Sequence, residues 1–206
     1  MSIETELSFI HRFVPATDPE RRPLLLLHGT GGNEDDLLPL GSLVSPGAAL
    51  LSPRGKVLEG GMPRFFRRYA EGVFDEDDLR RRAGELADFI AEAQKSYGLT
   101  TPIAVGFSNG ANIAAAVLQL RPEALAGAAL LRPMVPLQNP PTVELAGKSV
   151  LILSGASDPI VPLDNAKRLA SLLTGAGAGV QHRVLPGGHA VTQADLGHIK
   201  SWIDQL

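Results

Sequence analysis

Residues 102–120 read P-I-A-V-G-F-S-N-G-A-N-I-A-A-A-V-L-Q-L, and one serine joins two different local patterns. The run before Gly106 is short and apolar, as expected of a strand that is buried on both faces of a sheet. The run Asn109–Leu120 is apolar nearly all round, which predicts a helix packed at the centre of the molecule. The G-F-S-N-G segment therefore predicts a sharp strand-to-helix turn with Ser108 at its tip.

Short apolar runs of this kind recur along the chain and alternate with helical patterns. The predicted strands are Leu24–Leu27, Ala48–Ser52, Ile103–Phe107, Ala128–Leu131, Val150–Leu153 and Val180–Leu185. Apolar residues spaced by three or four predict helices over Leu79–Tyr97, preceded by the acidic Asp75–Asp78, and over Leu196–Leu206. This alternation predicts a single α/β domain over residues 1–206, with a mainly parallel sheet covered by helices on both faces.

Composition restricts the classes of protein that fit. A chain of 206 residues, 44% hydrophobic and 20% charged, suits one globular domain with no separate lid domain. The net charge of −3 predicts no nucleic-acid partner. The absence of cysteine excludes disulfides, thiolate zinc sites and a cysteine nucleophile. An acidic N-terminus and the lack of any long apolar run predict a cytoplasmic protein without membrane insertion.

A serine nucleophile needs a base, and five histidines are available. His189 lies in P-G-G-H directly after the last predicted strand, where a loop can carry it over Ser108. His182 lies inside that strand, His198 lies in the C-terminal helix and His11 lies near the N-terminus, so structural or exposed roles suit them better. We expect His189 to be the base.

The base in turn needs a carboxylate that fixes its tautomer. Asp158 in S-G-A-S-D-P follows the predicted strand Val150–Leu153 and is our candidate. Asp164 and Asp195 each lie in the first turn of a predicted helix, where capping is the better interpretation and is worth at most about a kcal/mol. The resulting order of serine, acid and histidine is the order that this architecture uses.

The segment H-G-T-G-G, His28–Gly32, follows the first predicted strand. Its glycines allow a turn in which the Thr30 N–H, together with the Asn109 N–H, faces a substrate oxyanion. A phosphate-binding loop is the alternative, but Glu34 stands where such a motif needs glycine. We expect a structural role for His28. The sequence has no H-E-x-x-H motif, so we expect neither a metal nor another cofactor.

Residues 57–74 have no clear period, and a structureless stretch of that length is usually functional. We expect it to overhang the site. The candidate substrate-binding residues are Met62, Phe65, Phe66, Tyr69 and, after a later strand, Met134. The alternative is a satellite hydrophobic cluster that fixes the loop. Arg64, Arg67 and Arg68 are typical of a solvated face, with recognition of a substrate carboxylate as the alternative.

The chain resembles the short carboxylesterase and phospholipase family of α/β hydrolases, whose relatives include acyl-protein thioesterases. The likeness extends from about Arg22 to Trp202. It rests on L-H-G-T-G-G-N-E-D-D-L (27–37), L-S-P-R-G (51–55), G-M-P-R-F-F-R-R (61–68), G-F-S-N-G-A-N (106–112), R-P-M (132–134), S-G-A-S-D-P-I-V-P (154–162) and G-G-H (187–189). The resemblance implies an α/β-hydrolase fold and a triad of Ser108, Asp158 and His189. Many relatives carry Gln after the nucleophile, whereas Asn109 is similar to a bacterial branch often linked to quinone or aromatic detoxification.

The sequence therefore predicts a serine carboxylesterase that acts on small esters through an acyl-enzyme. A thioesterase or lysophospholipase is the alternative within enzymes and would need a long apolar channel. A ligand receptor on a hydrolase scaffold is the alternative outside enzymes, because such a protein can keep the triad.

Overall fold

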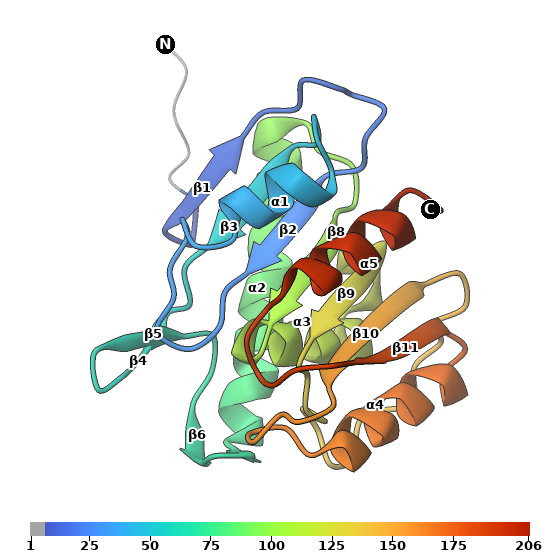
Figure 1. Cartoon of the computed structure of the whole chain (residues 1–206). Helices are drawn as coiled ribbons and strands as arrows, with labels where there is room; N and C mark the ends of the chain where they lie inside the picture. Colours follow the sequence, from blue (N-terminus) through green and yellow to red (C-terminus); the bar gives the residue numbers. More distant parts are fainter. Residues whose placement is uncertain (1–6) are drawn as a thin grey trace.

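Seven strands form the central sheet of the computed structural model, which describes residues 7–206 (Figure 1). In sheet order they are β1 (His11–Val14), β3 (Leu50–Pro53), β2 (Leu24–Leu27), β8 (Ile103–Phe107), β9 (Gly127–Leu131), β10 (Ser149–Gly155) and β11 (Gly179–Leu185). The pairing of β1 with β3 is antiparallel, and the other pairs of this sheet are parallel. The prediction of a mainly parallel sheet is confirmed.

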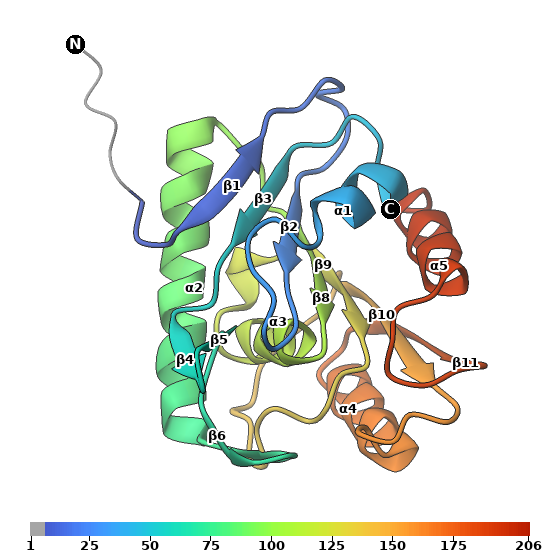
Figure 2. The ribbon, with the colours of Figure 1, turned by 60° about the vertical axis from the view of Figure 1, so that its left-hand side comes forward.

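Helices cover both faces of the sheet, as predicted (Figure 2). One face carries α2 (Glu76–Tyr97), α3 (Asn109–Leu120) and α4 (Leu163–Gly175), and the other carries α1 (Leu38–Val44) and α5 (Gln193–Ile203). Side chains of β2 alternate between the two cores: Leu25 and Leu27 pack on the first face, and Leu24 and Leu26 pack on the second. A strand buried on both sides has no polar position, which is why β2 consists of four leucines.

The strand and the helix on either side of Ser108 have the predicted bounds, β8 over Ile103–Phe107 and α3 over Asn109–Leu120. Eleven of the twelve residues of α3 are buried, because the helix lies between the sheet and α2. The helix predicted over Leu79–Tyr97 begins earlier, at Glu76, where the Asp75 carboxylate accepts a hydrogen bond from the Asp78 N–H at 3.1 Å. This N-cap is the one that the acidic run indicated.

Two expectations about local structure were wrong. The segment 57–74 is not structureless, because it forms two short hairpins, β4 (Val57–Glu59) with β5 (Met62–Arg64) and β6 (Arg68–Ala70) with β7 (Val73–Phe74). The strand β11 is an edge strand rather than one buried on both faces, and most of its residues are exposed or half-buried. An edge strand lacks a neighbour on one side, so its apolar residues do not report full burial.

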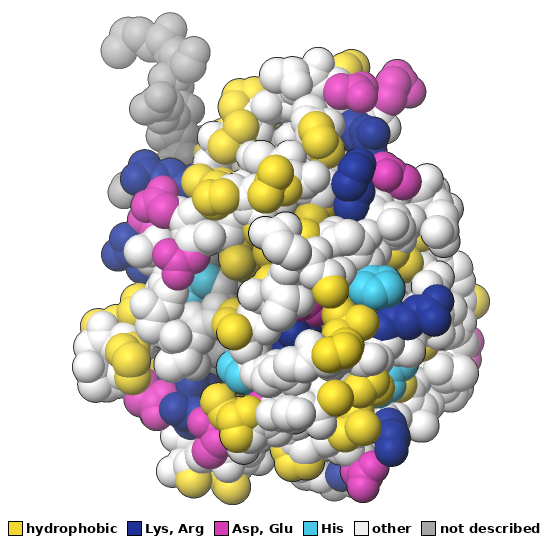
Figure 3. All heavy atoms as spheres, viewed as in Figure 1, with side chains coloured by type: hydrophobic (Ala, Val, Ile, Leu, Met, Phe, Trp, Pro, Cys, Tyr) yellow, Lys and Arg dark blue, Asp and Glu magenta, His cyan; other side chains and the backbone are white. Residues whose placement is uncertain are grey.

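Charged side chains of both signs are interspersed on the face shown in Figure 3, with no broad patch of one sign there. Among residues 7–206, no helix combines the length and the apolar character that crossing a bilayer requires. The prediction about the acidic N-terminus rests on Glu4 and Glu6, which lie outside the described residues.

Candidate active site

The turn that carries Ser108 is held in a strained conformation by close packing. Ser108 has φ 51° and ψ −111°, a region that non-glycine residues rarely adopt. A Cβ on Gly106 would lie 2.5 Å from the Gly110 carbonyl oxygen, and a Cβ on Gly110 would lie 2.0 Å from the Leu27 carbonyl oxygen. Only glycine fits at both positions, so the two glycines let the chain turn sharply enough to raise Ser108 above the carboxyl end of β8.

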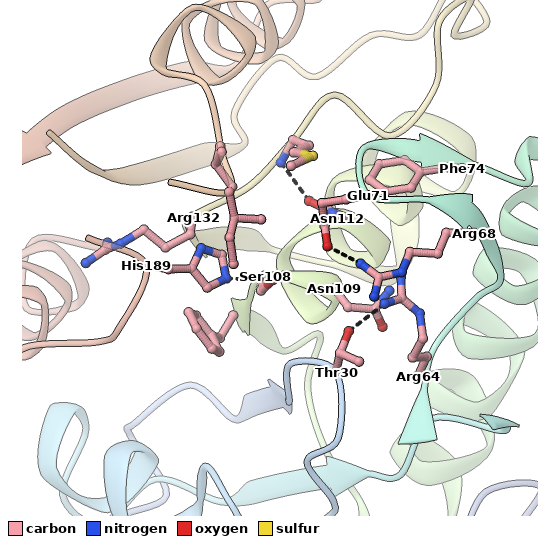
Figure 4. A pocket seen from close by; sticks show the side chains of 14 residues that line it. Thr30, Arg64, Arg68, Glu71, Phe74, Ser108, Asn109, Asn112, Arg132 and His189 are labelled. Carbon is pink, nitrogen blue, oxygen red and sulfur yellow. Dashed lines mark hydrogen bonds and ion pairs between the residues drawn. The ribbon is translucent and has the colours of Figure 1, made fainter. Parts of the chain in front are cut away.

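Three side chains from separate strand ends form one hydrogen-bonded series, of which Figure 4 shows Ser108 and His189. The Nε2 atom of His189, in the loop after β11, lies 3.1 Å from Ser108 Oγ. Its Nδ1 atom lies 2.9 Å from Oδ2 of Asp158, in the loop after β10. The structure thus brings together the serine, the histidine and the acid that the sequence singled out.

The Asp158 carboxylate is buried and accepts several hydrogen bonds. Burial by itself raises the pKa of Asp158, but N–H donors of Val161 and Ile160 and the His189 ring outweigh it and lower the pKa below its ordinary value. The two N–H groups donate to Oδ1 at 3.0 and 2.8 Å. An ionised Asp158 can only accept, so the bond to His189 requires a proton on Nδ1 and leaves the Nε2 lone pair directed at Ser108.

The N–H groups of Thr30 and Asn109 lie at the ends of adjacent strands, β2 and β8. Neither N–H has an acceptor among residues 7–206, which leaves both free for a substrate oxygen. The segment after β5 supports this arrangement: the Phe65 N–H donates to the Asn109 side-chain oxygen at 2.7 Å. Arg64 Nη1 donates to Thr30 Oγ1 at 2.6 Å, and the Gly31 N–H donates to the Pro63 carbonyl at 3.0 Å.

His28 is buried and takes the structural role expected of it. Its Nδ1 donates to the Gly29 carbonyl at 2.7 Å, and its Nε2 accepts from the Gly55 N–H at 3.0 Å. Burial lowers the pKa of His28, so the neutral ring that this bonding pattern requires is also the favoured one.

Arg132, to which the sequence analysis assigned no role, fixes the loop that carries His189. It follows β9 with φ 54°, and its side chain is fully buried. Its guanidinium donates five hydrogen bonds, which is all that it can donate. The carbonyls of Gly188 and Ala190, on either side of His189, each accept one at 3.0 Å.

The remaining bonds of Arg132 go to the Leu153 carbonyl and to both carboxylate oxygens of Asp195, at 2.8 and 2.9 Å. Asp195 also completes a capping box with Thr192 at the start of α5, so its expected capping role is present. Asp195 is also completely buried and balances the buried charge of Arg132, a role that the capping interpretation and its value of at most about a kcal/mol did not include. No local signal links the two residues, which lie 63 positions apart.

The other histidines and Asp164 lie away from this site. His182 Nε2 bonds Ser154 Oγ at 2.9 Å, and His11 Nε2 bonds the Tyr97 hydroxyl at 2.7 Å. His198 is exposed on α5. Asp164 lies in the first turn of α4 with its side chain 92% exposed and forms an ion pair with Lys167.

A cavity of about 260 Å³ opens over Ser108 and His189. Of the five expected substrate-binding residues, Met134 lines it. Phe65 and Phe66 are buried in the core, whereas Met62 and Tyr69 are largely exposed, and none of these four lines the cavity. The positions of the two phenylalanines match the alternative interpretation, a hydrophobic cluster that fixes the loop.

The rest of the apolar wall comes from residues outside that expectation, namely Phe74, Phe107, Ile160 and Val161. The polar wall of the cavity includes Arg64, Arg68, Glu71 and Asn112 (Figure 4). Arg67 is not part of the cavity: its side chain is 61% exposed and binds Asp75 at 2.8 Å. Among the described residues, no group of three or more potential metal ligands comes together.

Replacing Asp195 by asparagine should destabilise the fold strongly, because the variant keeps the side-chain shape but leaves the buried Arg132 charge without its partner. We expect a loss of about 3–5 kcal/mol in the free energy of unfolding, measured by urea titration. Asp164→Asn is the matched control on an exposed helix start and should change the free energy by less than about 0.5 kcal/mol. Equal effects of the two substitutions would show that Arg132 does not depend on Asp195.

Comparisons with known proteins show the family of this chain. The sequence profile of the Phospholipase/Carboxylesterase family matches residues 10–206. Putative hydrolase MhqD of Bacillus subtilis (strain 168) is 48% identical over 181 residues, covering 87% of this chain and 90% of that protein. The carboxylesterase of Bacillus cereus has 48% identity and a TM-score of 0.94, covering 96% of this chain and 94% of that one. The carboxylesterase of Mesorhizobium loti has 34% identity and a TM-score of 0.93, covering 98% and 97%. The chain therefore belongs to the phospholipase/carboxylesterase family of α/β hydrolases.

Proposed function

We propose that this chain is a serine carboxylesterase that hydrolyses small carboxylic esters through a covalent acyl-enzyme. The observation that supports it is the unbroken hydrogen-bonded series from Asp158 through His189 to Ser108, beside two unused N–H groups. Acyl transfer by a serine requires a base hydrogen-bonded to the hydroxyl and an acid that orients the base, and these three residues are arranged in that way. Two carboxylesterases among the similar structures support the same class of reaction.

In this mechanism Ser108 Oγ forms a bond to the ester carbonyl carbon while His189 Nε2 takes the hydroxyl proton. The carbonyl electron pair moves onto its oxygen, and the N–H groups of Thr30 and Asn109 stabilise that oxyanion. When the pair returns, the bond to the alcohol oxygen breaks and Nε2 gives its proton to the leaving alcohol. Water then attacks the acyl-enzyme through the same steps, and the carboxylic acid is released. The proposal assigns no step to a metal or cofactor.

Asp158 contributes by orientation and charge. Its lowered pKa keeps it ionised, so it stabilises the imidazolium that forms on His189 and keeps the Nε2 lone pair directed at Ser108. Both roles depend on the two backbone N–H groups that hold the carboxylate in place.

The cavity favours small esters over the alternative substrates. Sites for drug-sized ligands have volumes of about 300–1,000 Å³, and this cavity of about 260 Å³ lies below that range. The five apolar residues that line it, Phe74, Phe107, Met134, Ile160 and Val161, share it with charged and amide side chains, so it is not the long apolar channel that a lysophospholipase or long-chain thioesterase needs.

A series of p-nitrophenyl esters tests the function and its size limit. We expect many turnovers per protein molecule, with kcat/KM highest for acetate and butyrate and lower for octanoate and palmitate, because long chains exceed the cavity. A release of only one equivalent of nitrophenol or none would favour the receptor alternative. A kcat/KM that rises through palmitate would favour the lysophospholipase alternative.

Asp158→Asn tests the assignment of the acid. Asparagine keeps a hydrogen bond but allows the wrong tautomer of His189, which costs up to about 10⁴-fold in turnover in the best-studied triad. Asp164→Asn removes the same charge from an exposed side chain and should leave turnover within a few-fold of wild type. Turnover numbers should be measured together with thermal midpoints, so that unfolding is recognised. An Asp158→Asn protein that is folded and as active as the Asp164→Asn protein would refute the assignment.

A further inference from the structure

One wall of the cavity presents hydrogen-bond donors that the protein itself leaves unused. Arg64 is on β5 and Arg68 is on β6, and both bind Glu59, at 3.2 and 3.0 Å, which places the two guanidinium groups side by side. Asn112 comes from the first turns of α3. All three side chains line the cavity that also contains Ser108 (Figure 4).

Each arginine is bound by the protein through part of its guanidinium. Arg64 Nε donates to the Phe66 carbonyl at 3.2 Å. Its Nη1 donates to Thr30 Oγ1 and forms an ion pair with Glu59. Arg68 Nε donates to Glu59, and its Nη1 donates to Glu71. Neither Nη2 has an acceptor among residues 7–206, and neither is enclosed by protein atoms. Two Nη2 groups are therefore open to a ligand.

Asn112 adds a third donor. Its side-chain oxygen accepts a hydrogen bond from the Met134 N–H at 2.7 Å, which fixes the orientation of the amide. The Nδ2 group then points the other way, has no protein acceptor within residues 7–206 and is not completely buried. The same wall thus offers two guanidinium edges and one amide edge.

The acidic residues of this cluster lie nearer to solvent than the arginines. The side chains of Glu59 and Glu71 are 39% and 54% exposed, whereas those of Arg64 and Arg68 are 3% and 19% exposed. The glutamates bind Nη1 of Arg64 and both Nε and Nη1 of Arg68, and the two Nη2 groups remain for the cavity. A carboxylate is the planar partner whose geometry matches a guanidinium edge, so it suits the two open Nη2 groups.

The arrangement of the strands indicates which part of an ester meets this wall. His189 must give its proton to the leaving alcohol, so the alcohol lies on the side of β10 and β11. Thr30, to which Arg64 donates, follows β2 on the other side of β8. In Figure 4 the two arginines likewise lie across Ser108 from His189, where the acyl group must extend.

We propose that the preferred substrates are esters whose acyl group carries a free carboxylate, such as half-esters of short dicarboxylic acids, and that Arg64, Arg68 and Asn112 bind this carboxylate. The inference rests on the proposed esterase function and names the substrate class of the same site. The cavity volume of about 260 Å³ limits the acid to a short chain.

Two methyl esters of equal length test the proposal. Monomethyl succinate carries the carboxylate, and methyl levulinate replaces it with a neutral methyl ketone. We expect wild-type kcat/KM to favour monomethyl succinate by about tenfold, the effect of one charge-assisted hydrogen bond or more. Arg68→Gln should bring the ratio of the two values close to one. Because each ratio is taken within one protein, a general loss of activity cancels.

Arg67→Gln is the matched control, since it removes the same charge from the neighbouring residue, whose exposed side chain binds Asp75. It should leave the ratio at its wild-type value. We avoid Arg64 as the test position because Arg64 also holds Thr30. Equal kcat/KM values for the two esters in the wild-type protein would overturn the proposed substrate class.

Inhibition of the wild-type protein gives a second measurement that needs no variant. With p-nitrophenyl acetate as the reporter substrate, succinate should inhibit competitively with a Ki about tenfold below that of succinamide, which has the same length but no carboxylate. Succinamide that inhibits as well as succinate would refute the carboxylate site while leaving the esterase function intact. Failure to hydrolyse p-nitrophenyl acetate at all would instead refute the proposed function.

Discussion

The close approach of α3 to β2 is the constraint on which the rest of the site depends. Gly110 packs its backbone against the Leu27 carbonyl, at a distance that no Cβ would allow. This contact places the start of α3, which begins with Asn109, beside the end of β2, which leads into the turn that contains Thr30. It also forces Ser108 into a conformation that costs about 1–3 kcal/mol in other proteins. The burial of almost every residue of α3 offsets that strain.

Charge pairing fixes the other half of the site. His189 lies on a loop, and loops are mobile unless something holds them. Arg132 binds the carbonyls on both sides of His189, and Asp195 binds Arg132 while it caps α5. The loop is therefore attached to a helix on the far face of the sheet from α3. On the opposite side, Arg64 holds Thr30, so each half of the site has its own buried arginine.

Local patterns were sufficient to predict the strand, turn and helix around Ser108, because each residue there is constrained by its immediate neighbours. They also indicated His189 and Asp158, since both follow predicted strands and the carboxyl ends of parallel strands meet at one edge. Arg132 could not be found this way, because its partner Asp195 is distant in sequence and both residue types are common on surfaces. The hairpins over 57–74 were missed for a related reason: contacts that hold this segment, such as the Phe65 N–H bond to Asn109 and the packing of the Phe65 ring against His28, join residues distant in sequence.

The covalent step at Ser108 is the central claim, and labelling with a serine-directed organophosphate measures it most directly. Such a reagent needs a serine activated by its base and stabilised by oxyanion donors, so it reports the whole arrangement at once. We predict one adduct per molecule, located by mass spectrometry on the peptide that contains residues 106–112, with esterase activity lost in proportion to labelling. Complete loss of activity with the adduct on another residue, or full activity with Ser108 labelled, would contradict the account.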